Sequence, residues 1–293
     1  MTNRFSRTFK FFMSIAFILF ASAITTYAQK TNTMEGSNKS GYAPVNGLNM
    51  YYEIHGKGDL PLVLIHGGGS TIESSFGNTL PLFAAKGKVI AVELQAHGRT
   101  SDRNAPESFE QDADDVAALL KYLKVDKANF FGFSNGGTTT LQIAIRHPEI
   151  VNKIIDLSGA YQREGFIPGF FEGFPKATLE TMPAPLKDAF LKVTPDKDKL
   201  QVMFNKDVAR MMHFKDIPES DIQSIKAPAL IMVTDKDVVP AEHAVKMSHK
   251  IPGARLVILP GFHGACIGEI CSAKKGSKVP ELTVALIEEF LNE

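Results

Sequence analysis

A six-residue stretch, Gly132-Phe133-Ser134-Asn135-Gly136-Gly137, constrains this chain more than any other. It follows an apolar run at 128–131 that predicts a buried strand, and it precedes a helix-compatible segment at 138–147. A strand that turns directly into a helix through Gly-x-Ser-x-Gly predicts a nucleophile elbow, in which the serine backbone is strained and the flanking glycines avoid clashes. Ser134 is therefore the candidate nucleophile, and the alternative is a glycine-rich loop with a solvated serine.

The first 28 residues have the pattern of a signal peptide. Arg4, Arg7 and Lys10 form a basic start, and the apolar segment 11–24 that follows is short for a membrane span. The residues that end at Ala28 are typical of a cleavage site. We expect export to the periplasm or secretion, with no stable membrane anchor after cleavage. An uncleaved membrane anchor is the alternative.

The charge balance says little about macromolecular partners. Removing the signal takes away three positive charges and leaves 29 Lys and Arg against 32 Asp and Glu. This balance does not indicate nucleic acid or an anionic surface as a partner. Residues 29–43 are polar and predict a flexible tether. The remaining length suits one large α/β domain, and the sequence indicates no oligomeric state.

Strand-like and helix-like patterns alternate along the chain. Asn46-Gly47 predicts a tight hairpin turn before a strand at 48–55. Further strands are expected at 60–65, 88–94, 128–131, 150–157, 228–234 and 254–259, and helices at 108–124, 138–147 and 281–291. This alternation predicts an α/β fold with a mostly parallel eight-stranded sheet and helices on both faces. We assign residues 44–161 and 227–293 to this core.

The segment 162–226 interrupts the alternation. It has no clear strand, several prolines and glycines, a cluster of phenylalanines, and helix-like pieces near 177–192 and 196–213. We interpret it as an insertion that forms a small helical cap over the carboxyl ends of the strands. Phe170 and Met211 are the candidate substrate contacts, which favours a small-molecule substrate with an apolar acyl or aromatic part. The alternative is that these side chains form only the core of the cap.

A glycine-rich loop follows the buried strand at 60–65. His66 begins this loop and three glycines continue it, so that backbone N–H groups can approach a substrate oxygen. We expect Gly68 and Asn135 to be the two oxyanion donors, with Gly69 as a lesser alternative. His66 is better suited to ordering this loop than to acting as a base.

The acid and the base that a serine nucleophile needs are expected after the last two strands of the chain. Asp235 and Asp237 end the strand at 228–234, where a carboxylate can orient a histidine, and we favour Asp237. His263 follows the last strand, so the nucleophile, the acid and the base occur in the chain order of this type of triad. Among the other histidines, His97 has the next best position for contacting a substrate.

Together these motifs resemble the α/β-hydrolase superfamily, in its branch of small esterase-like enzymes with a helical cap. The resemblance runs from about Asn46 to the C-terminus and implies a Ser134-His263-Asp237 triad that needs no metal or organic cofactor. Dehalogenases and epoxide hydrolases of this branch use an aspartate nucleophile, and Ser134 argues against both. The turn at 93–100 begins with Glu93 where family members often have Asp, so we draw no substrate contact from it.

The resemblance implies an exported serine hydrolase that cleaves a small ester or lactone through an acyl-enzyme. The same triad can also serve amide cleavage of the aminopeptidase type or carbon–carbon bond hydrolysis. A third alternative is a non-catalytic binding protein that retains the fold.

Cys266 and Cys271 are the two cysteines of the chain. An even number of cysteines in an exported protein permits a disulfide, which here would brace the loop of His263. Two reduced thiols are the main alternative. A metal site that used His263 and both cysteines would take the base away from the triad.

Overall fold

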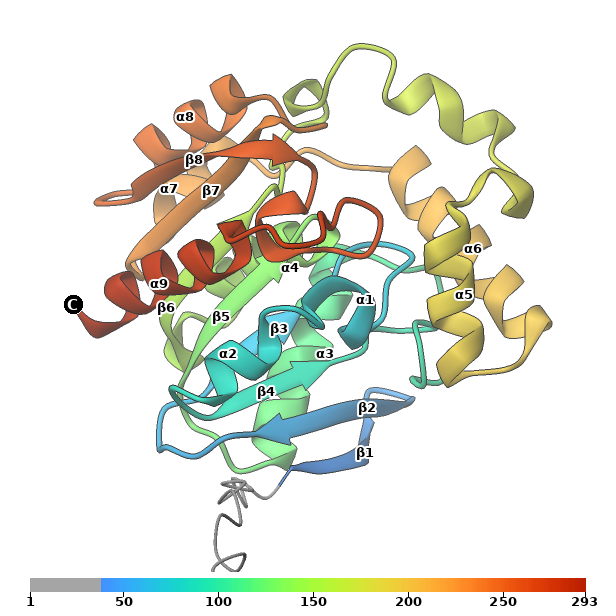
Figure 1. Ribbon diagram of the computed structural model, residues 1–293, viewed down its shortest axis with the longest axis horizontal. Coiled ribbons are helices and arrows are strands. Elements are labelled where there is room, and N and C mark those ends of the chain that lie inside the picture. Colours follow the sequence, from blue (N-terminus) through green and yellow to red (C-terminus); the bar gives the residue numbers. More distant parts are fainter. Residues whose placement is uncertain (1–37) are drawn as a thin grey trace, which may run out of the picture. The chain divides into compact units, whose positions relative to one another are not determined.

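The computed structural model describes residues 38–293, in which eight strands form one sheet (Figure 1). The strands, in chain order, are β1 (Lys39–Val45), β2 (Leu48–His55), β3 (Leu62–Ile65), β4 (Val89–Val92), β5 (Ala128–Phe133), β6 (Val151–Leu157), β7 (Ala229–Lys236) and β8 (Arg255–Phe262). Their order in the sheet is β1-β2-β4-β3-β5-β6-β7-β8. Pairing is antiparallel from β1 to β4 and parallel from β4 to β8, which confirms the predicted mostly parallel α/β sheet.

The helices alternate with these strands. They are α1 (Ile72–Phe76), α2 (Leu80–Ala84), α3 (Phe109–Tyr122), α4 (Asn135–Arg146), α5 (Ala184–Val193), α6 (Lys197–Met212), α7 (Glu219–Ser224), α8 (Ala241–Lys250) and α9 (Val279–Asn292). Within residues 38–293, we find no helix that combines the length and apolar character of a membrane span. The predicted signal peptide lies outside the described residues.

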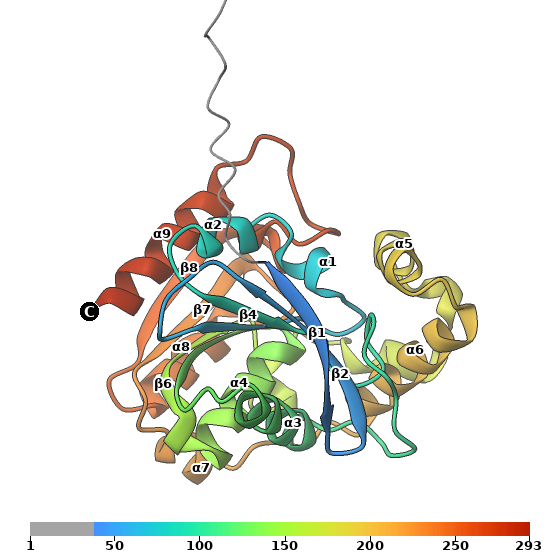
Figure 2. The same cartoon turned by 90° about the horizontal axis from the view of Figure 1, so that it is seen from below.

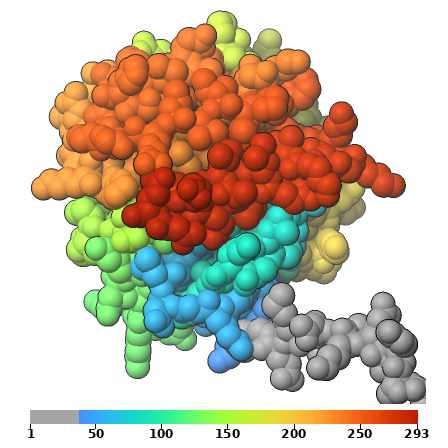
Figure 3. Space-filling view, turned by 60° about the vertical axis from the view of Figure 1, so that its left-hand side comes forward, coloured from blue at the N-terminus to red at the C-terminus, as the bar shows by residue number. Residues whose placement is uncertain are grey.

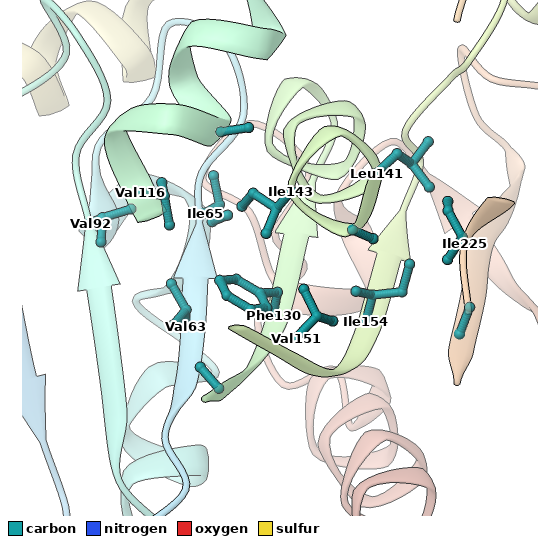
Figure 4. Packing of buried hydrophobic residues seen from close by; sticks show 14 of the residues in the cluster. Val63, Ile65, Val92, Val116, Phe130, Leu141, Ile143, Val151, Ile154 and Ile225 are labelled. Carbon is teal, nitrogen blue, oxygen red and sulfur yellow. The ribbon is translucent and has the colours of Figure 1, made fainter. Parts of the chain in front are cut away.

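Helices cover both faces of the sheet because alternate side chains of each inner strand point to opposite sides (Figure 2). Val63 and Ile65 of β3 and Phe130 of β5 pack toward α3 and α4, as the close view of this cluster shows (Figure 4). Leu64 and Phe131 of the same strands face the other side, where they join apolar residues of α1, α2 and α9. The continuous apolar runs that predicted these strands thus reflect burial on both faces.

The end of the chain closes one face of the sheet. In the space-filling view, the dark red C-terminal helix lies against the cyan surface formed by residues near α2 (Figure 3). Val284, Ile287 and Phe290 of α9 are buried there. The amphipathic pattern expected at 281–291 therefore marks a helix that covers the sheet.

The N-terminal hairpin corrects one boundary. Asn46 and Gly47 have φ angles of 45° and 82°, which form the predicted tight turn between β1 and β2. However, β1 begins at Lys39 and pairs with β2 along its length. The tether predicted at 29–43 is therefore wrong for residues 39–43, because alternate positions such as Ala43 are buried in the core and a polar composition does not prevent an edge strand from pairing.

The segment between β6 and β7 also needs a boundary correction. As predicted, it has no strand, and α5 and α6 form its main helices. Its last part belongs to the core, because Ile217, Ile222 and Ile225 pack in the same cluster as α4 and β6. The cap insertion predicted to reach residue 226 therefore ends before Ile217.

The elbow depends on a close approach between β3 and α4. Ser134 has φ 57° and ψ −121°, a strained conformation for a residue with a side chain. A Cβ added to Gly136 would lie 2.1 Å from the carbonyl oxygen of Ile65, and a Cβ added to Gly132 would lie 1.9 Å from the carbonyl oxygen of Gly136. Backbone atoms cannot yield as a flexible side chain can, so both positions require glycine.

We expect Gly136→Ala to lower the folded yield and the melting temperature sharply, because the new methyl group would meet backbone atoms of β3. Soluble expression and thermal unfolding measure this effect. Gly173→Ala is a matched control in the cap, where an added Cβ meets no atom within 4 Å. An alanine at position 136 that melts with the parent protein would contradict this account of the elbow.

Candidate active site

Three side chains from three strand ends form a hydrogen-bonded chain. The Ser134 hydroxyl follows β5 and lies 3.0 Å from His263 Nε2. On the other side of the imidazole ring, Nδ1 of His263 lies 2.6 Å from Oδ1 of Asp237, which follows β7. With its proton on Nδ1, the ring donates to Asp237 and accepts from the serine, as a general base must. The structure thus brings together the nucleophile, base and acid expected from the sequence.

The carboxylate of Asp237 is fixed by several donors. Ser158 Oγ and Thr234 Oγ1 each donate to Oδ2 at 2.7 Å, and the backbone N–H of Val239 donates to Oδ1 at 3.2 Å. Burial alone would raise the pKa of Asp237, but the hydrogen bond and charge of His263, together with the two hydroxyl donors, lower it to about 2. The group therefore stays ionised and holds the imidazole in one tautomer.

Asp235 has a different role from Asp237. Its Oδ1 accepts the backbone N–H of Gly261 at 2.7 Å, which fastens the end of β7 to the end of β8. Because Gly261 is two residues from His263, this bond shapes the loop that carries the imidazole. Of the two carboxylates weighed from the sequence, only Asp237 contacts His263.

We expect Asp237→Asn to lower kcat on an activated ester by roughly 10³- to 10⁴-fold, because an amide that donates to Nδ1 leaves the ring in the wrong tautomer. Steady-state kinetics on the purified protein measure the loss. Asp235→Asn is the matched control and should retain most of the activity, since its remaining amide oxygen can still accept from Gly261. Equal losses in the two variants would contradict this assignment of the acid.

The oxyanion loop has two backbone donors without a protein partner. Among the described residues, neither the N–H of Gly68 nor that of Asn135 is hydrogen-bonded. The loop packs against the elbow, since a Cβ on Gly67 would lie 3.2 Å from that of Ser134. Gly69, the lesser alternative, donates instead to a carboxylate oxygen of Asp207. The expected pair, Gly68 and Asn135, therefore remains available to a substrate oxygen.

His66 orders the oxyanion loop. It is fully buried, its Nδ1 donates to the carbonyl of Gly67 at 2.7 Å, and its Nε2 accepts the N–H of Leu94 at 3.0 Å. Burial, reinforced by the positive charge of His97, lowers its pKa to about 3, so the ring is neutral. The side chain is 0 % exposed and takes no part in the triad.

A buried group of charges links the cap to the core. Asp207 on α6 accepts from Nε2 of His97 at 3.0 Å and pairs with Arg210. Arg210 also reaches Asp112 of α3 at 2.7 Å, and Glu107 lies 3.5 Å away. Burial opposes a charged imidazolium, but the neighbouring carboxylates outweigh it and raise the pKa of His97 to about 9. His97 thus pairs with Asp207 and does not line the pocket, so the structure does not bear out a contact of His97 with substrate.

An apolar pocket of about 350 Å³ lies at the triad. Phe170 and Met211, the expected substrate contacts, both line it, as do Ser134 and His263. The cap contributes further apolar lining residues, namely Phe166, Phe174, Ala177, Met182, Pro183, Leu186, Met203, Phe204 and Val208. Phe170 and Met211 also pack in an apolar cluster that joins the cap to Phe109 and Val239 of the core, so they serve both in packing and in the pocket wall.

The turn that departs from the family pattern is held by its own charge pair. Glu93 is fully buried and accepts the N–H of Arg99 at 2.6 Å, and its other oxygen lies 2.8 Å from the Arg99 guanidinium. A Cβ on Gly98 would lie 2.3 Å from the Glu93 carboxyl carbon, so the longer glutamate requires this glycine. Glu93 is a structural residue and does not line the pocket.

Of the two alternatives left open for the cysteines, the structure has the reduced one: both are free thiols, and the candidate disulfide is not formed. Cys266 lies in a short 3-10 turn and is buried among apolar residues near α9, whereas Cys271 is exposed after the chain has turned at Gly268. Short sequence spacing could not reveal that the two side chains would have different surroundings. The loop is braced instead by Glu269, whose carboxylate accepts the N–H of Cys271 at 2.8 Å. In residues 38–293, no cluster of His, Cys, Asp or Glu has the arrangement of a metal site.

Sequence reasoning missed Asp207, Ser158 and Thr234. One signal could have identified Asp207: it lies four residues after Met203 and four before Met211, so an acidic side chain shares the apolar face of the cap helix. The two hydroxyl residues carry no comparable pattern, because strand ends commonly contain Ser and Thr.

Another buried carboxyl, that of Asp156, lies against α4, the helix that follows Ser134. Asp156 on β6 accepts the N–H of Gly159 at 3.0 Å through Oδ1, while its Oδ2 has no hydrogen-bond partner among the described residues. Burial raises the pKa of Asp156 from 3.8 to about 7, and the charge of Asp237 adds to this effect. At a pH between these two pKa values, Asp156 keeps its proton in the folded state but has lost it in the unfolded state. The stability of the folded protein therefore falls as the pH rises through this range.

We therefore expect Asp156→Asn to remove part of the loss of stability between about pH 4 and pH 7, and to make the protein more stable than the parent at pH 8. The neutral amide keeps an oxygen for Gly159 and avoids burying a charge. Urea unfolding at pH 5 and pH 8 measures the difference. An unchanged pH dependence would show that the Asp156 carboxyl is not the group responsible.

A model of the alpha/beta hydrolase fold family matches residues 61–211. The chain belongs to the alpha/beta hydrolase fold family. It is 30% identical over 231 residues to the serine hydrolase BPHL of Homo sapiens, a match that covers 74% of this chain and 77% of that protein. It is also 27% identical over 238 residues to the dihydrolipoyllysine-residue acetyltransferase component of the acetoin cleaving system of Pseudomonas putida. That match covers 74% of this chain, but this chain spans only 62% of the length of that protein.

Solved structures agree on the fold of this alpha/beta hydrolase. The enol-lactonase from Burkholderia xenovorans LB400 has a TM-score of 0.68 and 22% sequence identity, over 86% of this chain and 100% of that chain. At this level of identity the similarity concerns the fold. Together with the family model, it confirms the resemblance to alpha/beta hydrolases inferred from the elbow, the glycine-rich loop and the two late strand ends.

Proposed function

We propose that this alpha/beta hydrolase is an exported serine hydrolase that cleaves a small ester or lactone through an acyl-enzyme. The observation that carries the proposal is the hydrogen-bonded chain from Ser134 through His263 to Asp237. It lies at an apolar pocket, beside two backbone N–H groups that have no hydrogen-bond partner within residues 38–293. The 30% identical relative is named a serine hydrolase, which supports the reaction class. Export rests only on the pattern of residues 1–28.

Each step of the reaction has a group in place. His263 takes the proton of Ser134 as its oxygen attacks the carbonyl carbon, and Asp237 stabilises the imidazolium that forms. The N–H groups of Gly68 and Asn135 donate to the oxygen as it becomes negative. His263 returns the proton to the leaving alcohol, then activates a water molecule that releases the acid from Ser134. In a lactone, the alcohol and the acid are parts of the same product.

The shape of the pocket supports a small substrate with an apolar part. Its volume of about 350 Å³ lies at the lower end of small-molecule sites, and phenylalanine and methionine side chains make up much of its wall. Phe170 and Met211 would contact the acyl or aromatic portion. Methionine side chains adapt their shape to different ligands, so the site can accept related acyl groups.

We expect Ser134→Ala to abolish hydrolysis of short p-nitrophenyl esters and covalent labelling by a fluorophosphonate probe, because the attacking oxygen is removed. Release of p-nitrophenol and intact-protein mass spectrometry measure the two effects. Ser220→Ala, at an exposed position of α7, is the control and should behave as the parent.

Labelling that persists in Ser134→Ala would assign the nucleophile elsewhere. Tight ligand binding by the parent protein, with neither turnover nor labelling, would instead support the non-catalytic alternative. A parallel panel of lactones, aryl esters and prolyl amides separates ester hydrolysis from amide cleavage on the same triad.

A further inference from the structure

Asp207 places a carboxylate in an otherwise apolar wall. It is contributed by α6, and its side chain keeps 13% of its surface exposed. Of the described residues that line the catalytic pocket, only Asp207 and the triad histidine carry an ionisable side chain, and no lysine or arginine does. A substrate entering the pocket therefore meets one anionic group and no cation other than a protonated His263.

The cations that pair with Asp207 lie behind it. The side chains of His97 and Arg210 are 0% and 3% exposed, and neither lines the pocket. Their charges and hydrogen bonds outweigh the effect of burial and hold the pKa of Asp207 well below its usual value. Asp207 therefore remains an acceptor-only group toward the pocket, and the buried cations fix its position.

This carboxylate lies directly beside the oxyanion loop. It accepts the N–H of Gly69, and a Cβ on Gly68 would lie 3.2 Å from Asp207 Oδ2. Asn135 Nδ2 is 3.5 Å from Oδ1, a long contact that a better donor can replace. Since Gly68 and Asn135 are the proposed oxyanion donors, a group a few atoms from the scissile carbonyl can reach Asp207.

We infer that Asp207 selects the acyl part of the substrate: it accepts acyl groups that carry an ammonium group near the carbonyl and rejects those that carry a carboxylate there. An ammonium group can donate to the carboxylate, which makes a charge-assisted hydrogen bond. A carboxylate in the same place would face Asp207 without a cation to pair with, and would lose its hydration. This inference rests on the proposed ester hydrolysis and adds the chemistry of the acyl group.

Three ethyl esters that differ at one end test the inference. Ethyl butyrate, β-alanine ethyl ester and monoethyl succinate carry a methyl, an ammonium and a carboxylate group, respectively, and share the scissile bond. We expect the kcat/KM of the purified protein for the β-alanine ester to exceed that for monoethyl succinate by at least about 10-fold. Asp207→Asn should lower this ratio by about 10-fold, because the amide no longer distinguishes the two charges.

Two further variants make the result specific. Asp198→Asn removes a carboxylate from an exposed position on the same helix and should leave the ratio unchanged. Asp207→Glu keeps the charge and should retain the order of preference. If Asp207→Asn does not fold, the preference of the parent protein still decides, since faster cleavage of monoethyl succinate than of the β-alanine ester overturns the inference.

Fluorophosphonate labelling of Ser134 distinguishes failure of the inference about Asp207 from failure of the proposed function. A protein that is labelled and cleaves esters, but whose ratio is the same in the parent and in a folded Asp207→Asn variant, overturns the role of Asp207 alone. A protein that neither becomes labelled nor cleaves any ester in the panel overturns the proposed function, and with it the inference.

Discussion

Ser134 is held in a backbone conformation that costs on the order of 1–3 kcal/mol, and the geometry of the triad depends on that turn. The turn is stabilised by contacts on both of its sides. The N–H of Ser134 is fixed to the carbonyl of Leu157 on β6 at 2.8 Å, and α4 begins at the next residue. Glycines at 132 and 136 let the helix start directly against β3. The serine hydroxyl thus lies at the carboxyl end of the sheet, toward His263.

The order of the strands in the sheet explains why the other groups of the triad lie close to Ser134. Parallel strands end at one edge of a sheet, so the residues that follow β3, β5, β7 and β8 are neighbours in space although they are distant in sequence. The hydroxyl donors to Asp237 are Ser158, which directly follows β6, and Thr234 of β7, and these two strands are adjacent in the sheet. A single sheet topology therefore supplies the nucleophile, the acid, the base and the fixed donors of the acid.

Much of the core and the triad could be predicted from the sequence, and the reasons are local. A strand buried on both faces is a continuous apolar run, and an elbow needs glycines at fixed places. What escaped prediction depends on contacts between distant segments. Lys39 to Ala43 read as a tether because their polarity hid their pairing with β2. Ile217 read as part of the cap although it packs in the core, and the surroundings of Cys266 depend on how α9 docks.

Asp207 ties the conformation of the cap to that of the glycine-rich loop that follows β3. Its carboxylate receives the N–H of Gly69 from the oxyanion loop and pairs with His97 and Arg210, so one side chain fastens the cap helix to the core. Removing one partner of a buried charged pair commonly costs more stability than exposing a surface charge, because the remaining charge stays buried without compensation.

The position of the two candidate oxyanion donors therefore depends on the same network that holds the Asp207 carboxylate at the pocket. While Asp207 occupies the N–H of Gly69, that amide cannot turn toward the substrate, and the adjacent N–H of Gly68 remains the donor from this loop. On the inferred role of Asp207, a change of acyl preference on this scaffold would also require replacing its pairing with Gly69, His97 and Arg210. In the proposed reaction, α6 of the cap would therefore couple substrate choice to the rate of acyl transfer.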